Sequence, residues 1–313
     1  MKTNLINRIL EKPLTFPYFD SNKLREIQPM DLRYKLAMYE VTDSVINEHG
    51  VDEERIPEIL LAQYQAGRYI AQKLKNQGIT NVVAAEKSGM DVTTLSKALS
   101  GRRPFSPNAG HLIPLCCNVL HESCHKIMFG EEGRIKLPSP YAQVAKAMMD
   151  LEDSEKKKLL SKAKIQYALF AKMHPCDIPN GYRREQSRVI SERIHELLYD
   201  KGRQGYQFFG PDTPYQIRAV LKQYLLETSM KATPRIGFLM YLSFETELAL
   251  DYFISEDFTK YTSCYYYADD GTTEIEIDDS EVRSYIGICT SLPPEQRQLL
   301  MGEAIGINLG KSF

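Results

Sequence analysis

The stretch ITNVVAAEKSGMDVTTLSKALSGRRPF, residues 79–105, decides how the fold of this chain is interpreted. Thr80 can cap a helix of about eight residues that ends at Gly89, because a threonine side chain accepts hydrogen bonds from first-turn amides and glycine readily turns left-handed after a last turn. Asp91 can cap a second helix that ends at Gly101. The pattern predicts two short helices joined by a tight turn.

Small and apolar side chains determine how these two helices would pack. Ala84 and Ala85 allow two helix backbones to approach closely, and Met90 can fill the turn between them. Leu95 and Leu99 share one face of the second helix and can pack against the alanines. The polar residues of the second helix are then expected to point away from the core, and these are Thr93, Thr94, Ser96 and Lys97. This is the geometry of a helix-turn-helix, whose second helix enters the DNA major groove.

From Ile70 to about Gly130, a fifth of the chain, the sequence resembles the Cro/repressor-type (XRE-like) helix-turn-helix family. The residues that carry the resemblance are Thr80, Asn81, Ala85, Gly89, Met90 and Leu95, followed by LSGRRPFSP (99–107) and HLIPLCCNVLHESCHKIMFGEE (111–132). The resemblance implies DNA contacts by Asn81, Thr93, Thr94 and Lys97, to which the outward-pointing Ser96 is added, and phosphate contacts by Arg102 and Arg103.

The charge distribution agrees with a polyanionic partner for this part of the chain. The formal net charge is only -2, but residues 66–105 carry seven Lys and Arg against two acidic residues, a local net of +5. Residues 245–285 carry twelve Asp and Glu against two basic residues, a local net of -10. Double-stranded DNA would therefore be attracted to the first region and repelled by the second.

The composition is typical of a soluble globular protein. The 313 residues are 43% hydrophobic and 26% charged, and the length suggests about two domains. No apolar run approaches the roughly 18–20 residues of a membrane span, and MKTNLINRILEKPLTF (1–16) lacks the apolar core of a signal peptide. Six cysteines in a chain of this length do not indicate a disulfide framework. We expect a cytoplasmic protein without a membrane partner.

Helical periodicity runs through most of the chain, so we expect a mostly α fold. The expected domains are an N-terminal helical extension (1–65), a helix-turn-helix domain (66–135), a helical linker (136–180) and a helical repeat-like domain for dimerisation or sensing (181–313). Within the last, YTSCYYYADDGTTEIEIDD (261–279) has two β-prone runs on either side of Asp-Gly. This pattern predicts a β-hairpin with an acidic outer strand.

A weak internal repeat links the two halves of the sequence. YIAQKLKNQG (69–78) aligns with VISERIHELL (189–198) at an offset of 120, and VTTLSKAL (92–99) falls on PYQIRAVL (214–221). LEDSEKKKLL (151–160) falls on LPPEQRQLLM (292–301), after the hairpin has added residues. Because the order of the segments is kept throughout, we interpret the pattern as a duplication with a degenerate second copy.

The second copy departs from the pattern of a DNA reader. Tyr206 and Gln207 occupy the small-residue positions, and Pro211 stands where the turn glycine should be. A second set of DNA contacts could still come from Tyr215, Gln216 and Arg218. A dimerisation or ligand-sensing role is favoured, because bulky residues prevent the close crossing of the two helices.

The sequence contains no metal-site or enzyme motif with the residue spacing that such a site needs. Cys117, His121, Cys124 and His125 recur on about one helical face, but one straight helix cannot surround a zinc ion, so we expect buried thiols in a core. The acidic ADDGTTEIEIDD lacks the spacing of a calcium-binding loop. No phosphate loop, nucleophile elbow or metalloprotease helix occurs. We expect no enzymatic activity, no cofactor and no metal.

The sequence therefore predicts a DNA-binding transcriptional regulator that reads a specific site through helix 92–100 and binds as a homodimer, with a peptide or protein effector at the C-terminal domain. Whether it represses by occlusion or activates by recruitment stays open. One alternative is a helical interaction or peptide-sensing protein whose helix-turn-helix does not bind DNA. A weaker one is a replication or partition protein of a mobile element, which would need clustered sites.

Overall fold

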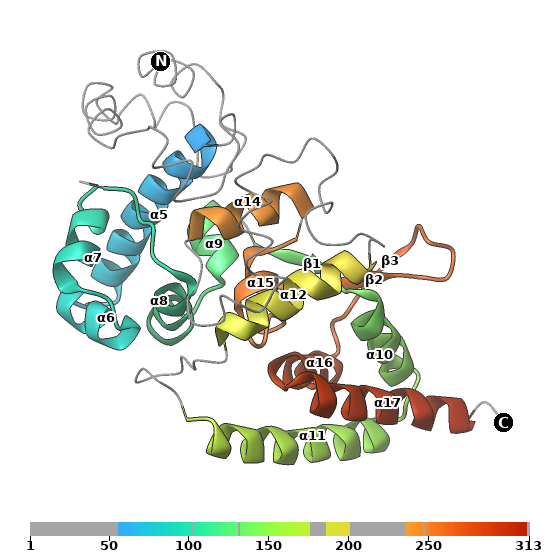
Figure 1. Cartoon of the computed structure of the whole chain (residues 1–313). Helices are drawn as coiled ribbons and strands as arrows, with labels where there is room; N and C mark the ends of the chain where they lie inside the picture. The colour runs from blue at the N-terminus through green and yellow to red at the C-terminus, as the bar shows by residue number, and fades with distance from the viewer. Residues whose placement is uncertain are drawn as a thin grey trace.

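The described part of the chain is mostly helical and carries one small sheet (Figure 1). In the computed structural model it comprises residues 56–101, 103–130, 132–175, 186–200, 236–246 and 248–311. The expected mostly α class is confirmed. Within these residues, no helix has both the length and the apolar character needed to cross a membrane. Residues 1–55, Arg102 and the second set of DNA contacts, Tyr215, Gln216 and Arg218, lie outside the described residues.

The first half of the described chain is a group of helices that pack on the long helix α5. Their bounds are α5 Ile56–Asn76, α6 Asn81–Ser88, α7 Val92–Leu99, α8 Ala109–Pro114, η1 Leu115–Leu120 and α9 Cys124–Phe129. Helix α5 packs against α7, η1 and α9, whereas α6 packs against α7, α8 and η1. The apolar faces of these helices therefore close a common core, with Ile70, Leu112 and Ile127 fully buried.

A second group of helices stands at the opposite end of the molecule (Figure 1). It consists of α10 Ser139–Met149, α11 Asp153–Met173, α16 Ser280–Ser291 and α17 Pro294–Lys311. Helices α10 and α11 fall in the range expected as a linker, and they pack against α16 and α17. The remaining helices are α12 Gln186–Asp200, α14 Ile236–Thr246 and α15 Leu250–Ile254, of which α12 packs on α15.

The sheet joins segments that are far apart in the sequence. Strand β1 (Arg134–Lys136) pairs in parallel with β2 (Ser263–Tyr267), and β2 pairs antiparallel with β3 (Glu274–Glu276). The hairpin expected from residues 261–279 is present, and its turn places Gly271 at a φ of 70°. The strand β1 was not expected, because a three-residue strand leaves too short a pattern to recognise.

Candidate functional site

Helices α6 and α7 begin and end where the local sequence predicts. The Thr80 hydroxyl accepts a hydrogen bond from the Val83 amide at 3.3 Å, and Gly89 follows the helix with a φ of 68°. The Asp91 carboxylate accepts a hydrogen bond from the Thr94 amide at 2.7 Å, which also lowers the pKa of that carboxyl group. Both caps satisfy amides that have no partner inside a helix, so the turn between the two helices is fixed.

Small residues bring three helices close together at this turn. Ala84, Ala85 and Leu95 have no exposed surface, as their spacing predicts. A further close contact involves Gly67 of α5, where an added Cβ would stand 2.7 Å from the carbonyl oxygen of Ala98 in α7. The local pattern did not reveal this contact, because a glycine inside a helix can have several causes. The backbones of α5 and α7 therefore lie close together, and this close packing helps to position the α6–α7 pair on α5.

The outward face of α7 carries most of the predicted contact residues. Thr93 and Lys97 are exposed, while Thr94 and Ser96 are half-buried. Asn81, in the first turn of α6, is also half-buried, and its Nδ2 donates to the Ser96 Oγ at 3.4 Å. The structure thus brings Asn81 and Ser96 together across the turn. Figure 1 shows α6 and α7 at one edge of the molecule, far from α11 and α17.

The basic residues around this face differ in their surroundings. Arg103 is half-buried, and Arg102 lies outside the described residues. Within the described part of the chain, Lys87, Lys97 and Arg103 form no ion pair. By contrast, Lys73 pairs with Glu122, which also accepts a hydrogen bond from Tyr69. The cations next to α7 are consequently available to an external anion, whereas Lys73 is already neutralised.

Sequence reasoning missed three apolar residues on the same helix pair. Val82 is 59% exposed, and Val83 and Val92 are each 38% exposed, which places uncovered methyl groups at the start of both helices. Only polar residues were considered as readers of a partner, so these valines were not singled out. Val92 is the first residue of α7 and precedes Thr93. An exposed valine next to this polar residue indicates that α7 can also make an apolar contact with a partner.

The four residues considered as zinc ligands occupy separate environments. Cys124 is buried, and burial raises the pKa of its thiol. The Nδ1 of His125 accepts a hydrogen bond from the Leu250 amide at 3.1 Å. His121 ends η1 in a left-handed conformation, with its Nδ1 3.1 Å from the carbonyl oxygen of Cys117. Among the described residues, no three His, Cys, Asp or Glu side chains converge as metal ligands.

A buried carboxylate joins the first helix group to the rest of the chain. Asp251 of α15 accepts hydrogen bonds from the amides of Cys124 and His125, at 2.9 and 2.8 Å, and so caps α9 from outside. Burial raises the pKa of Asp251 to about 6, although these hydrogen bonds oppose the shift. Burial also lowers the pKa of His125 to about 4. The contact spans more than a hundred residues, which no local pattern predicts.

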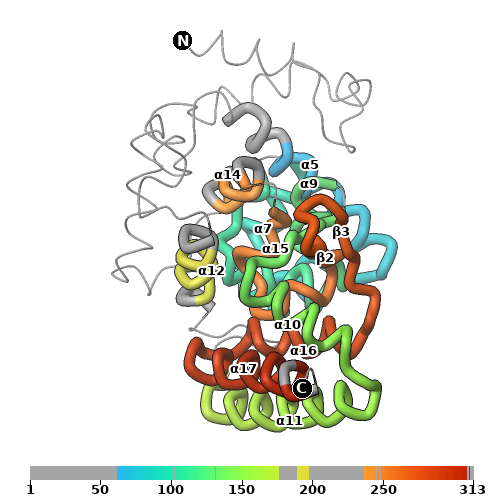
Figure 2. Tube along the Cα trace, turned by 90° about the vertical axis from the view of Figure 1, so that its right-hand side faces the viewer, coloured from blue at the N-terminus to red at the C-terminus, as the bar shows by residue number. Residues whose placement is uncertain are grey.

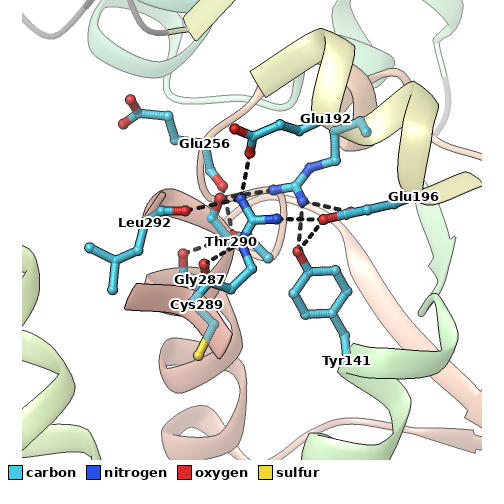
Figure 3. Close-up of polar contacts among 10 residues, drawn as sticks. Tyr141, Glu192, Glu196, Glu256, Gly287, Cys289, Thr290 and Leu292 are labelled. Atoms are coloured by element: carbon cyan, nitrogen blue, oxygen red, sulfur yellow. Dashed lines mark hydrogen bonds and ion pairs between the residues drawn. The ribbon is translucent and has the colours of Figure 1, made fainter. Parts of the chain in front are cut away.

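A second buried polar cluster fixes α12 (Figure 3). Arg193 has no exposed surface and donates to the Tyr141 hydroxyl, the Glu196 carboxylate and the Thr290 carbonyl oxygen at 2.8–2.9 Å. Arg297 of α17 donates to Glu192 of α12 at 2.7 Å, and it also pairs with Glu196. Both guanidinium groups are paired with carboxylates. The cluster therefore connects α12 with α10, α16 and α17 instead of offering a reactive group.

Comparisons of the chain with protein-family models, with curated proteins and with solved structures gave no match.

Proposed function

We propose that the protein is a sequence-specific double-stranded DNA-binding regulator that inserts α7 into the major groove. The observation that carries the proposal is the capped α6–α7 pair with its outward polar face. A helix-turn-helix needs a fixed turn, a second helix with free first turns, and a first helix that crosses the phosphate backbone. In this chain the fixed turn would be at Gly89, and the second helix would be α7 with its exposed Thr93 and Lys97. The first helix would be α6, which the Asn81–Ser96 contact joins to α7.

Electrostatics supports the choice of partner. Lys87 and Lys97 lie on this helix pair and form no ion pair with any residue that the structure describes, so a phosphate backbone could bind them at little cost. The acidic β2–β3 hairpin lies on the side of the molecule away from α7 (Figure 1), and Lys146 and Arg134 already pair there with Asp269 and Glu274. A DNA duplex docked on α7 would thus approach the basic end of the molecule and avoid the acidic one.

The rival proposal is a helical interaction protein that keeps this fold without binding DNA. The tyrosine-rich outer face of the hairpin favours it, since Arg134 and Lys136 stack over the rings of Tyr265 and Tyr267. Such a mixed aromatic and charged face is suited to a protein or peptide partner. Salt dependence separates the two proposals, because DNA binding through about five phosphates weakens with a log–log slope near -4 to -5.

The experiment that tests the proposal is selection from random duplex DNA by the full-length chain. The variant Lys97→Ala/Thr93→Ala removes two exposed residues of α7, and Lys158→Ala/Ser161→Ala removes two exposed residues of α11 as a matched control. We expect wild type and the α11 variant to enrich the same motif, and the α7 variant to lose it while keeping its helical circular dichroism. Equal enrichment by both variants would contradict the placement of α7.

A further inference from the structure

Two pairs of helices in this chain share most of their buried positions. In α10 and α11 the buried residues include Tyr141, Val144, Ala145, Met148, Leu159 and Leu160. In α16 and α17 they include Val282, Tyr285, Ile286, Cys289, Leu300 and Met301, each of which lies 141 positions after its counterpart. The two pairs also begin alike, since α10 starts at Ser139 and α16 at Ser280. Because the offset is kept across both helices, the two pairs share the spacing between their helices as well as the helical period.

The two pairs pack on each other reciprocally. Helix α11 packs against α16, α17 packs against α10, and α10 and α16 pack against each other. Figure 2 shows these four helices gathered at the end of the molecule away from α14. Lys162 and Glu303 are counterparts, 141 positions apart, and the Lys162 Nζ lies 2.6 Å from the Glu303 Oε1. A residue meets its own counterpart only near a two-fold axis, so the pairs are related by an approximate two-fold rotation.

The β1–β2 ladder also joins the two halves, although its strands run parallel and do not themselves repeat the two-fold rotation. In the β1–β2 ladder, Arg134, Ile135 and Lys136 pair with Ser263, Cys264 and Tyr265, which are 129 positions later. Between these strands and the following helices the second half contains the β2–β3 hairpin, and across it the offset changes from 129 to 141. A single insertion therefore explains why the two offsets differ.

Two short helices of the two halves cap each other at their first turns, where His125 and Asp251 each stand second in the helix. His125 of α9 and Asp251 of α15 are 126 positions apart, and each caps the other helix. The Asp251 carboxylate accepts the His125 amide, while the His125 Nδ1 accepts the Leu250 amide. Further upstream, Ile70 and Leu74 of α5 are buried, as are Ile190 and Ile194 of α12 at the offset of 120. Reciprocal capping is what a two-fold relationship between the helices predicts.

We propose that the chain is an internal dimer, in which residues from α12 to α17 are a diverged copy of residues from α5 to α11. The surface with which two identical chains would pair is then occupied within one chain. The DNA part of this inference rests on the proposed function: a single chain, and not a homodimer, is the unit that binds a target site.

The two halves differ in sequence near the two-fold axis, and these differences bear on the symmetry of the DNA target site. Two identical chains would place lysine against lysine, or glutamate against glutamate, where Lys162 meets Glu303. The buried cations Lys156 and Arg297 are also counterparts but bind different partners. Lys156 pairs with Asp279, the cap of α16. The residue in the corresponding position before α10 is Pro138, which cannot form an ion pair. Arg297 therefore pairs with Glu192 of α12 instead. The halves are not interchangeable, so we expect a target site without two-fold symmetry.

Sedimentation of the full-length chain tests the internal dimer without DNA. We expect a mass of one chain, 35.9 kDa, at micromolar concentrations, and a melting temperature that does not change with protein concentration. A mass of two chains, or a melting temperature that rises with concentration, would overturn the inference. This result does not depend on whether the protein binds DNA.

Charge reversal at the axis tests the contact between counterparts. Lys162→Glu places two glutamates at the axis and Glu303→Lys two lysines, so each single variant should melt at a lower temperature than wild type. The double variant Lys162→Glu/Glu303→Lys should recover the loss at every protein concentration. Recovery in a mixture of the two single variants, which cannot restore the pair within one chain, would mean that the pair forms between chains.

Selection from random duplex DNA tests whether a single chain is the unit that binds a target site. One chain per duplex on an asymmetric motif supports the inference, and a palindromic motif that binds two chains contradicts it. If no motif is enriched, the proposed function fails, and the sedimentation mass still decides whether the chain is an internal dimer.

Discussion

Gly67 of α5 lies directly against the backbone of Ala98 in α7, because a Cβ at position 67 would stand 2.7 Å from the Ala98 carbonyl oxygen and 3.3 Å from its carbonyl carbon. Both neighbouring atoms belong to the backbone and cannot swing aside. The position of α7 is therefore set by a backbone contact as well as by the side chains of the core.

The first prediction concerns this contact. Gly67→Val should lower the free energy of unfolding by about 1–3 kcal/mol, since extra atoms in a filled space force the helices apart. The control is Gly302→Ala in α17, where an added Cβ meets nothing within 4 Å. That variant should gain roughly 0.5–1 kcal/mol from helix propensity. Urea unfolding measures both; equal effects at the two glycines would contradict the proposed closeness.

The second prediction concerns Val92. As an exposed apolar residue at the start of α7, it should contact a thymine methyl group in the proposed DNA complex. Replacing the contacted thymine by deoxyuridine removes that methyl group and should weaken wild-type binding about fourfold, which corresponds to roughly 0.8 kcal/mol.

A matched variant separates this contact from general weakening. Val92→Ala should bind the thymine and deoxyuridine duplexes almost equally, whereas Val83→Ala in α6 should keep the wild-type preference. Quantitative titration of both duplexes measures the ratio. If no position of the selected motif responds to deoxyuridine, Val92 does not read a methyl group.

The third prediction concerns pH. The folded-state pKa of Asp251 is raised from 3.8 to about 6, so its contribution to stability is full below pH 3.8 and is lost as pH rises through 6. The folded-state pKa of His125 is lowered from 6.5 to about 4, so its contribution is present above pH 6.5 and is lost as pH falls towards 4. The two slopes oppose each other between pH 4 and 6.

Single variants should reveal each slope separately. Asp251→Asn leaves the His125 slope, so its stability relative to wild type should rise between pH 4 and 6. His125→Asn leaves the Asp251 slope, and its relative stability should fall over the same range, with each change on the order of 2–3 kcal/mol. Melting temperatures at half-unit pH intervals measure this. Parallel curves for the two variants would disprove the opposite shifts.

The fourth prediction concerns the buried Arg193. Arg193→Ala should lower the free energy of unfolding by about 3–5 kcal/mol, because it leaves Tyr141 and the Thr290 carbonyl oxygen without their buried donor. Arg193→Lys should also lower the free energy of unfolding, because one ammonium group cannot reach both acceptors and stack on Phe258 as the guanidinium does. The exposed Arg68→Ala is the control. Calorimetry should rank these variants in that order, and a neutral Arg193→Lys would refute the fork geometry.

Features that depend on neighbouring residues could be predicted from the sequence. The caps at Thr80 and Asp91, the turn at Gly89 and the hairpin around Gly271 all follow from side chains and backbone preferences within a few positions. The burial of Ala84 and Leu95 also followed from helical spacing. Such signals survive in a sequence because the groups that interact are close in the chain.

Contacts between distant segments could not be predicted from the sequence and became visible in the folded chain. The β1–β2 pairing, the capping of α9 by Asp251 and the meeting of Lys162 with Glu303 each join residues more than a hundred positions apart. A three-residue strand or a lone aspartate looks the same in sequence whether or not such a partner exists. The weak repeat hinted at two related halves, but their reciprocal packing depends on how whole helices fit together, and helical periodicity alone does not specify which faces meet.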